Sequence, residues 1–310
     1  MNVNDVQQDE WYTVYCGPGK FILPLRYQNI ALIGQGTYGI VVRATDTTTG
    51  KYVAIKKLLR PFQCETLAKR TYRELKFLMY LNHPNAQVVQ LYNVFTPEQN
   101  VNEFQTLYLV LNFVECNLHR LLLAQELLSE EQIKLIIYSI LRSLKFIHSA
   151  GILHRDLKPT NIGIDKDSNV TFIEQSISYH LSRLAVGYEC ISAYISQKEP
   201  KPKRDFNELF GFKYDPLTQN PISGVSPEGV DLLDRLLSFD PRQRPTAEQA
   251  LSHRFLEFYH DPIEEPTIEP ISDEHQNVKH TRDQWKSIVW QMVQEFVPPS
   301  WVNDDSMDDS

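Results

Sequence analysis

The sequence predicts an α+β fold of two lobes, with a strand-rich N-terminal lobe and a mainly helical C-terminal lobe. Three observations support this prediction. Short apolar segments separated by glycine-containing turns dominate residues 29–57, whereas apolar residues recur with a helical period from residue 129 onward. The chain has 310 residues, of which 42% are hydrophobic and 23% charged, so it can bury a sizeable core in one large domain or two lobes.

The strand-rich part is expected to begin with three short strands at residues 29–33, 40–44 and 52–56. Glycines in the turns between them allow the tight reversals that such a meander needs. A helix over about 67–79 follows, with several basic residues on it, and a further strand pair is expected at 88–94 and 107–112. The N-terminal lobe is therefore a small sheet with one helix.

Helices are expected to dominate the second lobe. Ser129 and Gln132 form the pattern of a capping box, in which each side chain can bond an unpaired amide of the first turn. Apolar residues then follow a 3.6-residue period until Gly151, which is typical of a helix end. Two more apolar stripes predict helices that begin near Pro227 and span about 285–296, and such stripes are usually packing faces.

The formal net charge of −8 is concentrated near the C-terminus. Residues 261–310 contain 12 acidic and 3 basic residues, a net of −9, whereas residues 1–260 have a net of +1. This distribution favours basic partners for the C-terminal sixth, while the last eight residues are expected to be a solvated tail. It gives no indication of nucleic acid as a partner.

Cysteine usage and the N-terminus bear on the compartment. The four cysteines are far apart and include no Cys-x-x-Cys pair, which favours a reducing compartment over a zinc site or a disulfide framework. Neither a signal peptide nor an apolar stretch of membrane-spanning length is found, so no membrane partner is expected. We therefore expect a soluble intracellular protein in the cytoplasm, with the nucleus as a second location.

A glycine-rich loop is the first candidate functional motif. Gly34, Gly36, Gly39 and Val41 have the spacing G-x-G-x-x-G-x-V between two expected strands. Glycines let a hairpin backbone approach phosphate oxygens closely. A dinucleotide-binding fold would need a helix directly after the third glycine, but residues 40–44 are typical of a strand.

Lys56 and Glu74 strengthen this interpretation. Lys56 ends the expected strand 52–56, and Glu74 lies on the expected helix that follows. A lysine held by a glutamate can present a fixed positive charge to nucleotide phosphates. A lone Lys–Glu pair would be an ordinary surface pair, but this pair comes in the right order behind the glycine loop.

The strongest signal in the chain is the segment His-Arg-Asp-Leu-Lys-Pro-Thr-Asn at residues 154–161. Asp156 can accept the proton of a substrate hydroxyl, Lys158 can neutralise a transferring phosphate, and Asn161 can bind Mg²⁺. A chance match of eight residues that places three such polar side chains at this spacing, directly after a long helix, is not expected.

Together these motifs resemble a protein kinase, and four further segments resemble the mitogen-activated protein kinases of the stress-activated branch. These segments are residues 60–63, 68–75, 93–97 and 145–150. The resemblance implies a bilobal protein-kinase-like fold with a β-rich N-lobe and a mainly helical, truncated C-lobe. It implies an N-terminal extension at 1–19, an N-lobe at 20–112, a C-lobe at 113–260 that is shortened after residue 188, and an acidic docking region with C-terminal extension at 261–310.

The resemblance also assigns roles to individual residues. The residues expected around ATP are Ile33, Gly34, Gly36, Gly39, Val41, Ala54, Lys56, Leu111 and Val114. Lys56 and Glu74 would form the ion pair, and Asp156 and Lys158 would act in the transfer. Leu111 stands where this branch usually has a small residue, which implies a narrower pocket behind adenine. Asp261, Glu264 and Glu265 would bind basic docking motifs of substrates or regulators.

The sequence departs from the family where a metal-binding Asp-Phe-Gly triplet is expected. Glu174, Gln175 and Ser176 stand there instead. Glu174 keeps a carboxylate for Mg²⁺, but its extra methylene would move the metal, and a displacement near 1 Å can cost roughly 100-fold in rate. Val186-Gly187-Tyr188 falls on the phosphorylated Thr-Gly-Tyr of the branch, so Tyr188 is the remaining candidate for phosphorylation by an upstream MAP kinase kinase.

The segment after Tyr188 is short. Several tens of residues that hold the substrate-positioning loop and the central helix of the family have no counterpart before residue 193. Three hypotheses follow: a working Ser/Thr kinase, a pseudokinase scaffold or decoy, and a splice or gene-model variant. The resemblance implies an ATP-binding, Mg²⁺-dependent kinase of stress signalling, and the altered triplet and short segment predict that its phosphate transfer is weak or lost. A poorly covered C-lobe should expose apolar surface.

Overall fold

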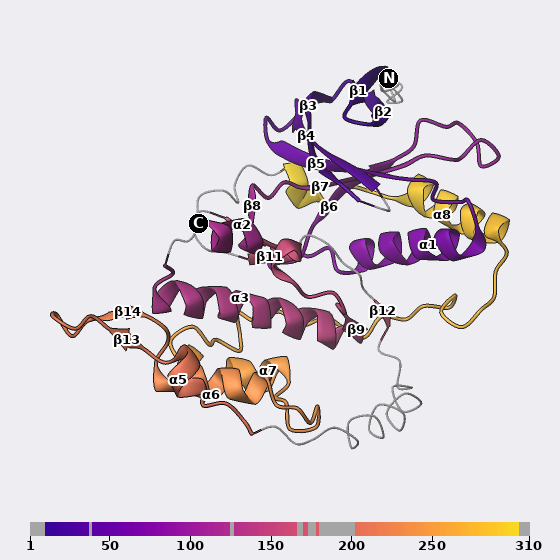
Figure 1. Cartoon of the computed structure of the whole chain (residues 1–310). Helices are drawn as coiled ribbons and strands as arrows, with labels where there is room; N and C mark the ends of the chain where they lie inside the picture. Colours follow the sequence, from indigo (N-terminus) through magenta and orange to yellow (C-terminus); the bar gives the residue numbers. More distant parts are fainter. Residues whose placement is uncertain are drawn as a thin grey trace. The chain divides into compact units, whose positions relative to one another are not determined.

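The computed structural model describes residues 10–36, 39–124, 127–165, 170–172, 178–179 and 202–303. They form two compact units (Figure 1). The first takes its described residues from Met1–Pro84, Val88–Glu115 and Ser272–Ser310, and the second from Asn85–Gln87 and Cys116–Ile271. The chain thus returns to the first unit at its C-terminal end.

An antiparallel five-stranded sheet forms the frame of the first unit. Its order is β3-β4-β5-β7-β6. The strands are β3 (Tyr27–Gln35), β4 (Gly39–Asp46), β5 (Tyr52–Leu58), β6 (Leu91–Phe95) and β7 (Leu107–Asn112). All five strands predicted from the sequence are present, and the sixth predicted element, the helix, is α1 (Glu65–Tyr80). The strand expected at 88–94 begins three residues later, after Gln87, which has a positive φ of 51°.

A hairpin with no counterpart among the expected strands precedes this sheet. Strands β1 (Trp11–Cys16) and β2 (Gly19–Pro24) pair with Trp11 opposite Pro24. Phe21 and Leu23 of β2 are completely buried in an apolar cluster with residues of the main sheet. The expected boundary between an extension at 1–19 and a lobe at 20–112 therefore cuts through a hairpin whose second strand is part of the core.

Tyr108 on β7 ties this hairpin to the sheet. The backbone amide of Ile22 donates a 3.0 Å hydrogen bond to the Tyr108 hydroxyl. Burial raises the pKa of Tyr108 to about 12, partly offset by that amide, so the hydroxyl stays protonated at physiological pH.

Helix α8 (Arg282–Glu295) belongs to the first unit, where it packs beside α1 (Figure 1). A capping box of Thr281 and Gln284 starts it, with both reciprocal bonds present. Trp285, Val289 and Val293 are buried in the same cluster as the apolar face of α1. The C-terminal extension is thus part of the core that holds α1, the helix with Glu74.

The second unit is built on α3 (Glu130–Ser149). The predicted capping box of Ser129 and Gln132 is confirmed, and the helix ends before Gly151, whose φ of 72° suits glycine. The predicted helix after Ser226 is α6 (Pro227–Leu236), with that serine as N-cap. Leu141 of α3 and Leu232 of α6 share a small buried cluster with residues of α7 (Ala247–Leu251) and of the 3-10 helix η2 (Arg254–Leu256).

Short elements complete the described part of the second unit. A three-stranded antiparallel sheet has the order β11-β10-β8 and presents the loop that precedes β10. The short elements are β8 (Cys116–Asn117), α2 (Leu118–Leu123), β9 (Ile152–Leu153), η1 (Pro159–Asn161), β10 (Ile162–Ile164), β11 (Val170–Phe172), β12 (Ser178–Tyr179), α5 (Phe206–Phe210), β13 (Lys213–Tyr214) and β14 (Pro221–Ser223). One more 3-10 helix, η3 (Ser300–Asn303), ends the described part of the first unit.

Several large apolar side chains of the second unit are exposed. Phe239 is 76% exposed, Leu217 93% and Phe258 95%. Tyr15 and Val297 of the first unit are similarly exposed, at 76% and 79%, so the exposure of apolar residues from a shortened lobe stays a prediction. Among the described helices, none is long and apolar enough to cross a membrane. Cys16, Cys64 and Cys116, the three cysteines in the described residues, are free thiols.

Candidate active site

Lys56 and Glu74 meet as the sequence predicted. The Lys56 Nζ lies 2.7 Å from the Glu74 Oε1, and the two side chains are 17% and 18% exposed. Lys56 sits on β5 between Val41 of β4 and Leu109 of β7, so strands on both sides fix its backbone. Glu74 lies on α1, which the buried face of α8 holds in place. An ion pair that is largely buried and held by the sheet and α1 can present one fixed positive charge to a phosphate.

The glycine loop joins β3 to β4. Its described ends are linked by a 2.9 Å hydrogen bond from the Gly36 amide to the Gly39 carbonyl. A Cβ on Gly39 would lie 2.9 Å from the Lys57 carbonyl oxygen and 3.3 Å from the Lys56 Cε, so only glycine fits there. A Cβ on Gly36 would meet no atom within 4 Å. The loop backbone can therefore approach a bulky ligand at Gly36, next to the strand that carries Lys56.

The apolar residues expected around a nucleotide lie on adjacent strands of this sheet. Ala54 of β5 pairs with Leu111 of β7, and both belong to a buried cluster against which Val41 packs. Ile33 of β3 is 47% exposed, and Val114, just after β7, is partly buried. The narrower pocket that Leu111 implies remains a prediction.

The segment 154–161 forms a compact polar cluster in the second unit. Lys158 Nζ donates to Asp156 Oδ2 at 2.8 Å, and Asn161 Nδ2 donates to the same oxygen at 3.0 Å. Asn161 Nδ2 also lies 2.9 Å from the Asp156 carbonyl oxygen. Asp156, Lys158 and Asn161, which the sequence assigned to one reaction, are thus brought together.

These contacts set the protonation state of Asp156. The hydrogen bond from Lys158, and after it the one from Asn161, lower the pKa of Asp156 below its ordinary value. The carboxylate therefore remains ionised at neutral pH and can accept a hydrogen bond from a substrate hydroxyl. It loses that ability only when the pH falls through this lowered pKa.

The backbone of the loop is held by residues that carry no assigned chemistry. His154 is 3% exposed, packs edge-on against Phe172 of β11 with ring centroids 5.2 Å apart, and its Nδ1 lies 3.3 Å from the Asp156 amide. Arg155 has a positive φ of 61°, which is uncommon outside glycine. Such strain persists only where the surrounding structure enforces it.

Magnesium would need oxygen ligands at this loop. Asn161, one of the two expected ligands, has an amide oxygen of the kind that Mg²⁺ prefers, and its amide nitrogen donates to the Asp156 carboxylate. One oxygen ligand of the required kind is therefore present among the described residues. Glu174, the other expected ligand, and Tyr188, the expected phosphorylation site, lie outside the described residues. Among the described residues, no group of three or more His, Cys, Asp or Glu could hold a metal.

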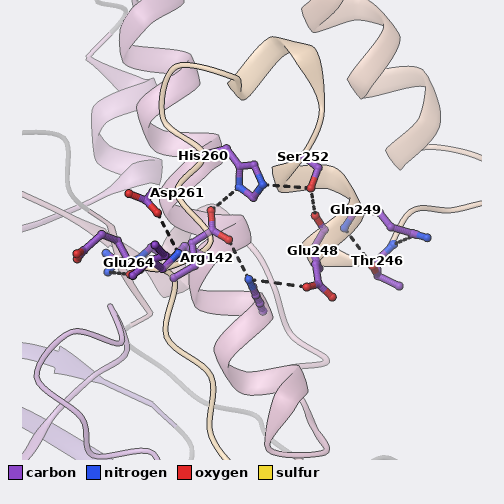
Figure 2. Close-up of polar contacts among 11 residues, drawn as sticks. Arg142, Thr246, Glu248, Gln249, Ser252, His260, Asp261 and Glu264 are labelled. Atoms are coloured by element: carbon purple, nitrogen blue, oxygen red, sulfur yellow. Dashed lines mark hydrogen bonds and ion pairs between the residues drawn. The ribbon is translucent and has the colours of Figure 1, made fainter.

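The predicted docking residues differ in their surroundings (Figure 2). Asp261 and Glu264 are exposed, at either side of Ile263, which is 92% exposed. The Glu265 side chain is fully buried, with Lys145 Nζ 3.0 Å from its Oε2 and His260 Nδ1 2.7 Å from its Oε1. Glu265 is therefore satisfied inside the unit, which differs from the expectation that it binds partners.

Two supporting residues, Asn112 and Lys145, carry no recognisable sequence signal. Asn112 at the end of β7 accepts a 2.8 Å hydrogen bond from the Gln90 amide through its side chain, and its own amide donates to the Gln90 carbonyl. Lys145 of α3 is the buried partner of Glu265. Nothing in the sequence around Asn112 or Lys145 indicates these contacts, because each contact is made with a segment distant in sequence.

Comparison with known proteins is consistent with these motifs. The protein kinase domain family matches residues 27–183. Mitogen-activated protein kinase 14 of Xenopus laevis is 32% identical over 335 aligned positions, which cover 89% of this chain and 92% of the relative. Mitogen-activated protein kinase 12 of Mus musculus is 31% identical over 331 positions, covering 88% and 89%.

A third relative, mitogen-activated protein kinase pmk-1 of Caenorhabditis elegans, is 30% identical over 359 positions, covering 93% of this chain and 91% of the relative. All three alignments are longer than the 310 residues of the chain. These relatives therefore contain residues without a counterpart here, as the short segment after Tyr188 leads one to expect.

Proposed function

This chain belongs to the mitogen-activated protein kinase family, and from that premise we propose that it binds Mg·ATP but transfers phosphate to Ser/Thr weakly or not at all. The observation that carries the proposal is the 2.7 Å Lys56–Glu74 pair behind a glycine loop, in a chain whose sequence alters the metal-binding triplet of the family. We further propose that it acts in stress signalling, in the cytoplasm or nucleus and under an upstream MAP kinase kinase, and its family membership supports this.

Nucleotide binding is supported by chain features that need no activation segment. Lys56 would hold phosphate oxygens, the glycine loop would cover them, and the apolar surface around Ala54 and Leu111 would contact adenine. Bound Mg²⁺ would supply positive charge next to the phosphates. On the protein side, Asp156 would orient the substrate hydroxyl and accept its proton, and Lys158 would offset charge on the phosphate.

Weak transfer follows from positioning. Phosphoryl transfer depends almost entirely on the placement of the phosphate, metal and nucleophile. Glu174 reaches farther than the aspartate of the family, Gln175 brings a polar amide to an apolar position, and the segment that would place a substrate is short. Each change acts on placement and leaves the nucleotide-holding residues intact.

A non-catalytic scaffold is the second candidate function, because Asp261 and Glu264 are exposed while Glu265 is not. We propose that these two acids, with the exposed Ile263 between them, bind a peptide that combines basic and apolar residues. A scaffold or decoy would need only this surface, so it would function without transfer. A splice or gene-model variant with an incomplete second unit would instead fail to unfold cooperatively.

Nucleotide binding can be tested by thermal unfolding. Mg·ATP at about one hundred times its Kd should stabilise the wild-type chain by about 2.7 kcal/mol. Lys56→Met should reduce this stabilisation strongly, because it removes the fixed cation, whereas Lys20→Met, at an exposed position of the same unit, should not. An unchanged Mg·ATP response in Lys56→Met, or no response in the wild type, would contradict the proposal.

Transfer is measured on the same proteins with radiolabelled ATP and Ser/Thr peptides. We expect at most slow labelling, and any labelling should fall about 10²- to 10⁴-fold in Asp156→Asn, which loses the general base. Fast labelling that requires Asp156 would overturn the claim of weak transfer and leave the nucleotide claim standing.

The docking surface gives a further prediction. Binding of a basic peptide should weaken as salt rises, since the two acids are exposed and screened. Reversing both charges, in Asp261→Lys with Glu264→Lys, should weaken binding about tenfold, because two exposed pairs of about 0.5–1 kcal/mol each are lost. The matched control is Glu208→Lys with Glu257→Lys, which makes the same charge change at exposed positions of the second unit. Equal affinities of the two double variants would refute the docking proposal.

A further inference from the structure

A pocket in the first unit has no role in the proposed function. Its volume is about 500 Å³, and it lies where α8 begins. One wall comes from the start of α8, a second from Phe62 and Gln63 just before α1, and a third from residues 101–105 between β6 and β7. Three segments distant in sequence therefore build it.

Lys286 is the unusual residue of this pocket. Its side chain lines the pocket although the residue is only 8% exposed. The Nζ donates to the backbone carbonyl of Asn102 at 2.9 Å. Among the described residues, no carboxylate lies within 4.0 Å of this ammonium group, which can donate three hydrogen bonds. A buried charge without a counter-ion is costly, so an anion that reached it would be bound favourably.

The remaining charged groups of the pocket do not compensate Lys286. Arg282 and Asp283 form an ion pair, with Arg282 Nη2 2.7 Å from Asp283 Oδ1, so their opposite charges cancel. The other polar lining residues are uncharged amides and a hydroxyl. Gln63 and Gln105 can both donate and accept hydrogen bonds. The pocket thus combines one net positive charge with several neutral polar groups.

The walls are held by an aromatic framework. Phe62 and Phe104 are buried with ring centroids 4.6 Å apart, and Phe104 meets Trp290 of α8 edge-on at 5.2 Å. These contacts join the three segments that line the pocket, so its shape does not depend on a ligand. A preformed site avoids the entropic cost of ordering its walls on binding.

We propose that this pocket binds a small polar organic anion, whose carboxylate or phosphate group pairs with Lys286 and whose polar body contacts Gln63 and Gln105. The volume of about 500 Å³ exceeds what a bare oxyanion fills, which is why a larger polar molecule is expected. The site is separate from the nucleotide-binding residues and requires neither ATP nor catalysis.

The test uses the full chain with three probes: inorganic phosphate, O-phosphoserine and succinate. Saturable binding is followed by ligand-observed NMR and by thermal unfolding. The proposal expects O-phosphoserine or succinate to bind more tightly than inorganic phosphate. Lys286→Met should weaken that binding about tenfold or more, as loss of a buried charge pair does. Lys279→Met, at an exposed position of the same unit, should leave it unchanged.

Gln63→Glu is the second variant, because it keeps Lys286 and places a competing carboxylate at an exposed position of the pocket. It should also weaken binding about tenfold, through repulsion and through pairing with the ammonium group. Binding that survives in both variants, or no saturable binding of any probe, would overturn the proposal. Binding that survives Lys286→Met but disappears in Lys56→Met would place the anion at the nucleotide site and would also overturn it.

Discussion

Replacing Glu265 by alanine should lower the free energy of unfolding by about 3–5 kcal/mol, which is the usual cost of removing one partner of a buried ion pair. The Glu265 side chain is fully buried and accepts from Lys145 and His260 at 3.0 and 2.7 Å. Without it, the Lys145 ammonium group, on a side chain only 11% exposed, keeps among the described residues the Glu248 carboxylate alone, at 4.0 Å. The variant therefore leaves a largely buried charge with one distant partner.

Glu264→Ala is the matched control for Glu265→Ala. The two residues are neighbours, but Glu264 is exposed, and the contact it offers to Arg142 comes from its backbone carbonyl, which alanine keeps. Its effect should stay within about 0.5 kcal/mol. Urea unfolding followed by far-UV circular dichroism measures both variants. A loss below about 1 kcal/mol in Glu265→Ala would show that the ion pair contributes little, as exposed pairs do.

Trp285→Ala should cost about 3–5 kcal/mol in the first unit, the range for removing a large aromatic side chain from a core. Trp285 is completely buried, with its ring centroid 4.8 Å from that of Tyr72 on α1 and 4.6 Å from that of His280. The cavity left behind would loosen α8 from α1. Because α1 carries Glu74, the stabilisation of this variant by Mg·ATP should fall as well.

Trp285→Phe distinguishes cavity formation from loss of the indole. The Trp285 Nε1 is buried without a hydrogen-bond partner in the described structure, so its loss carries no hydrogen-bond penalty. Phenylalanine should therefore cost clearly less than alanine. All four tryptophans lie in segments of the first unit, so the fluorescence of the remaining three follows its unfolding. Equal losses for the two variants would contradict packing as the cause.

Local sequence patterns predicted much of the structure. The five sheet strands, α1 and the capping box of α3 follow from periodicity, glycine turns and reciprocal caps, each of which acts within a few residues. The cluster of Asp156, Lys158 and Asn161 was equally predictable, because its members are five residues apart or fewer and one turn brings them together. Even Lys56 and Glu74 were recognisable, since their order behind a glycine loop is itself a pattern.

Interactions between distant segments were decided only by the tertiary structure. Glu264 and Glu265 are adjacent residues of the same type, yet Glu264 is exposed and Glu265 is buried against Lys145, which is 120 residues away in sequence. The stripe of α8 predicted a packing face but not its partner, which proved to be α1. Lys286 likewise gave no sign of burial until Asn102 and Phe62 were placed beside it. The charge and periodicity of a residue are local properties, whereas its burial and counter-ions are set by whatever the folded chain packs against it.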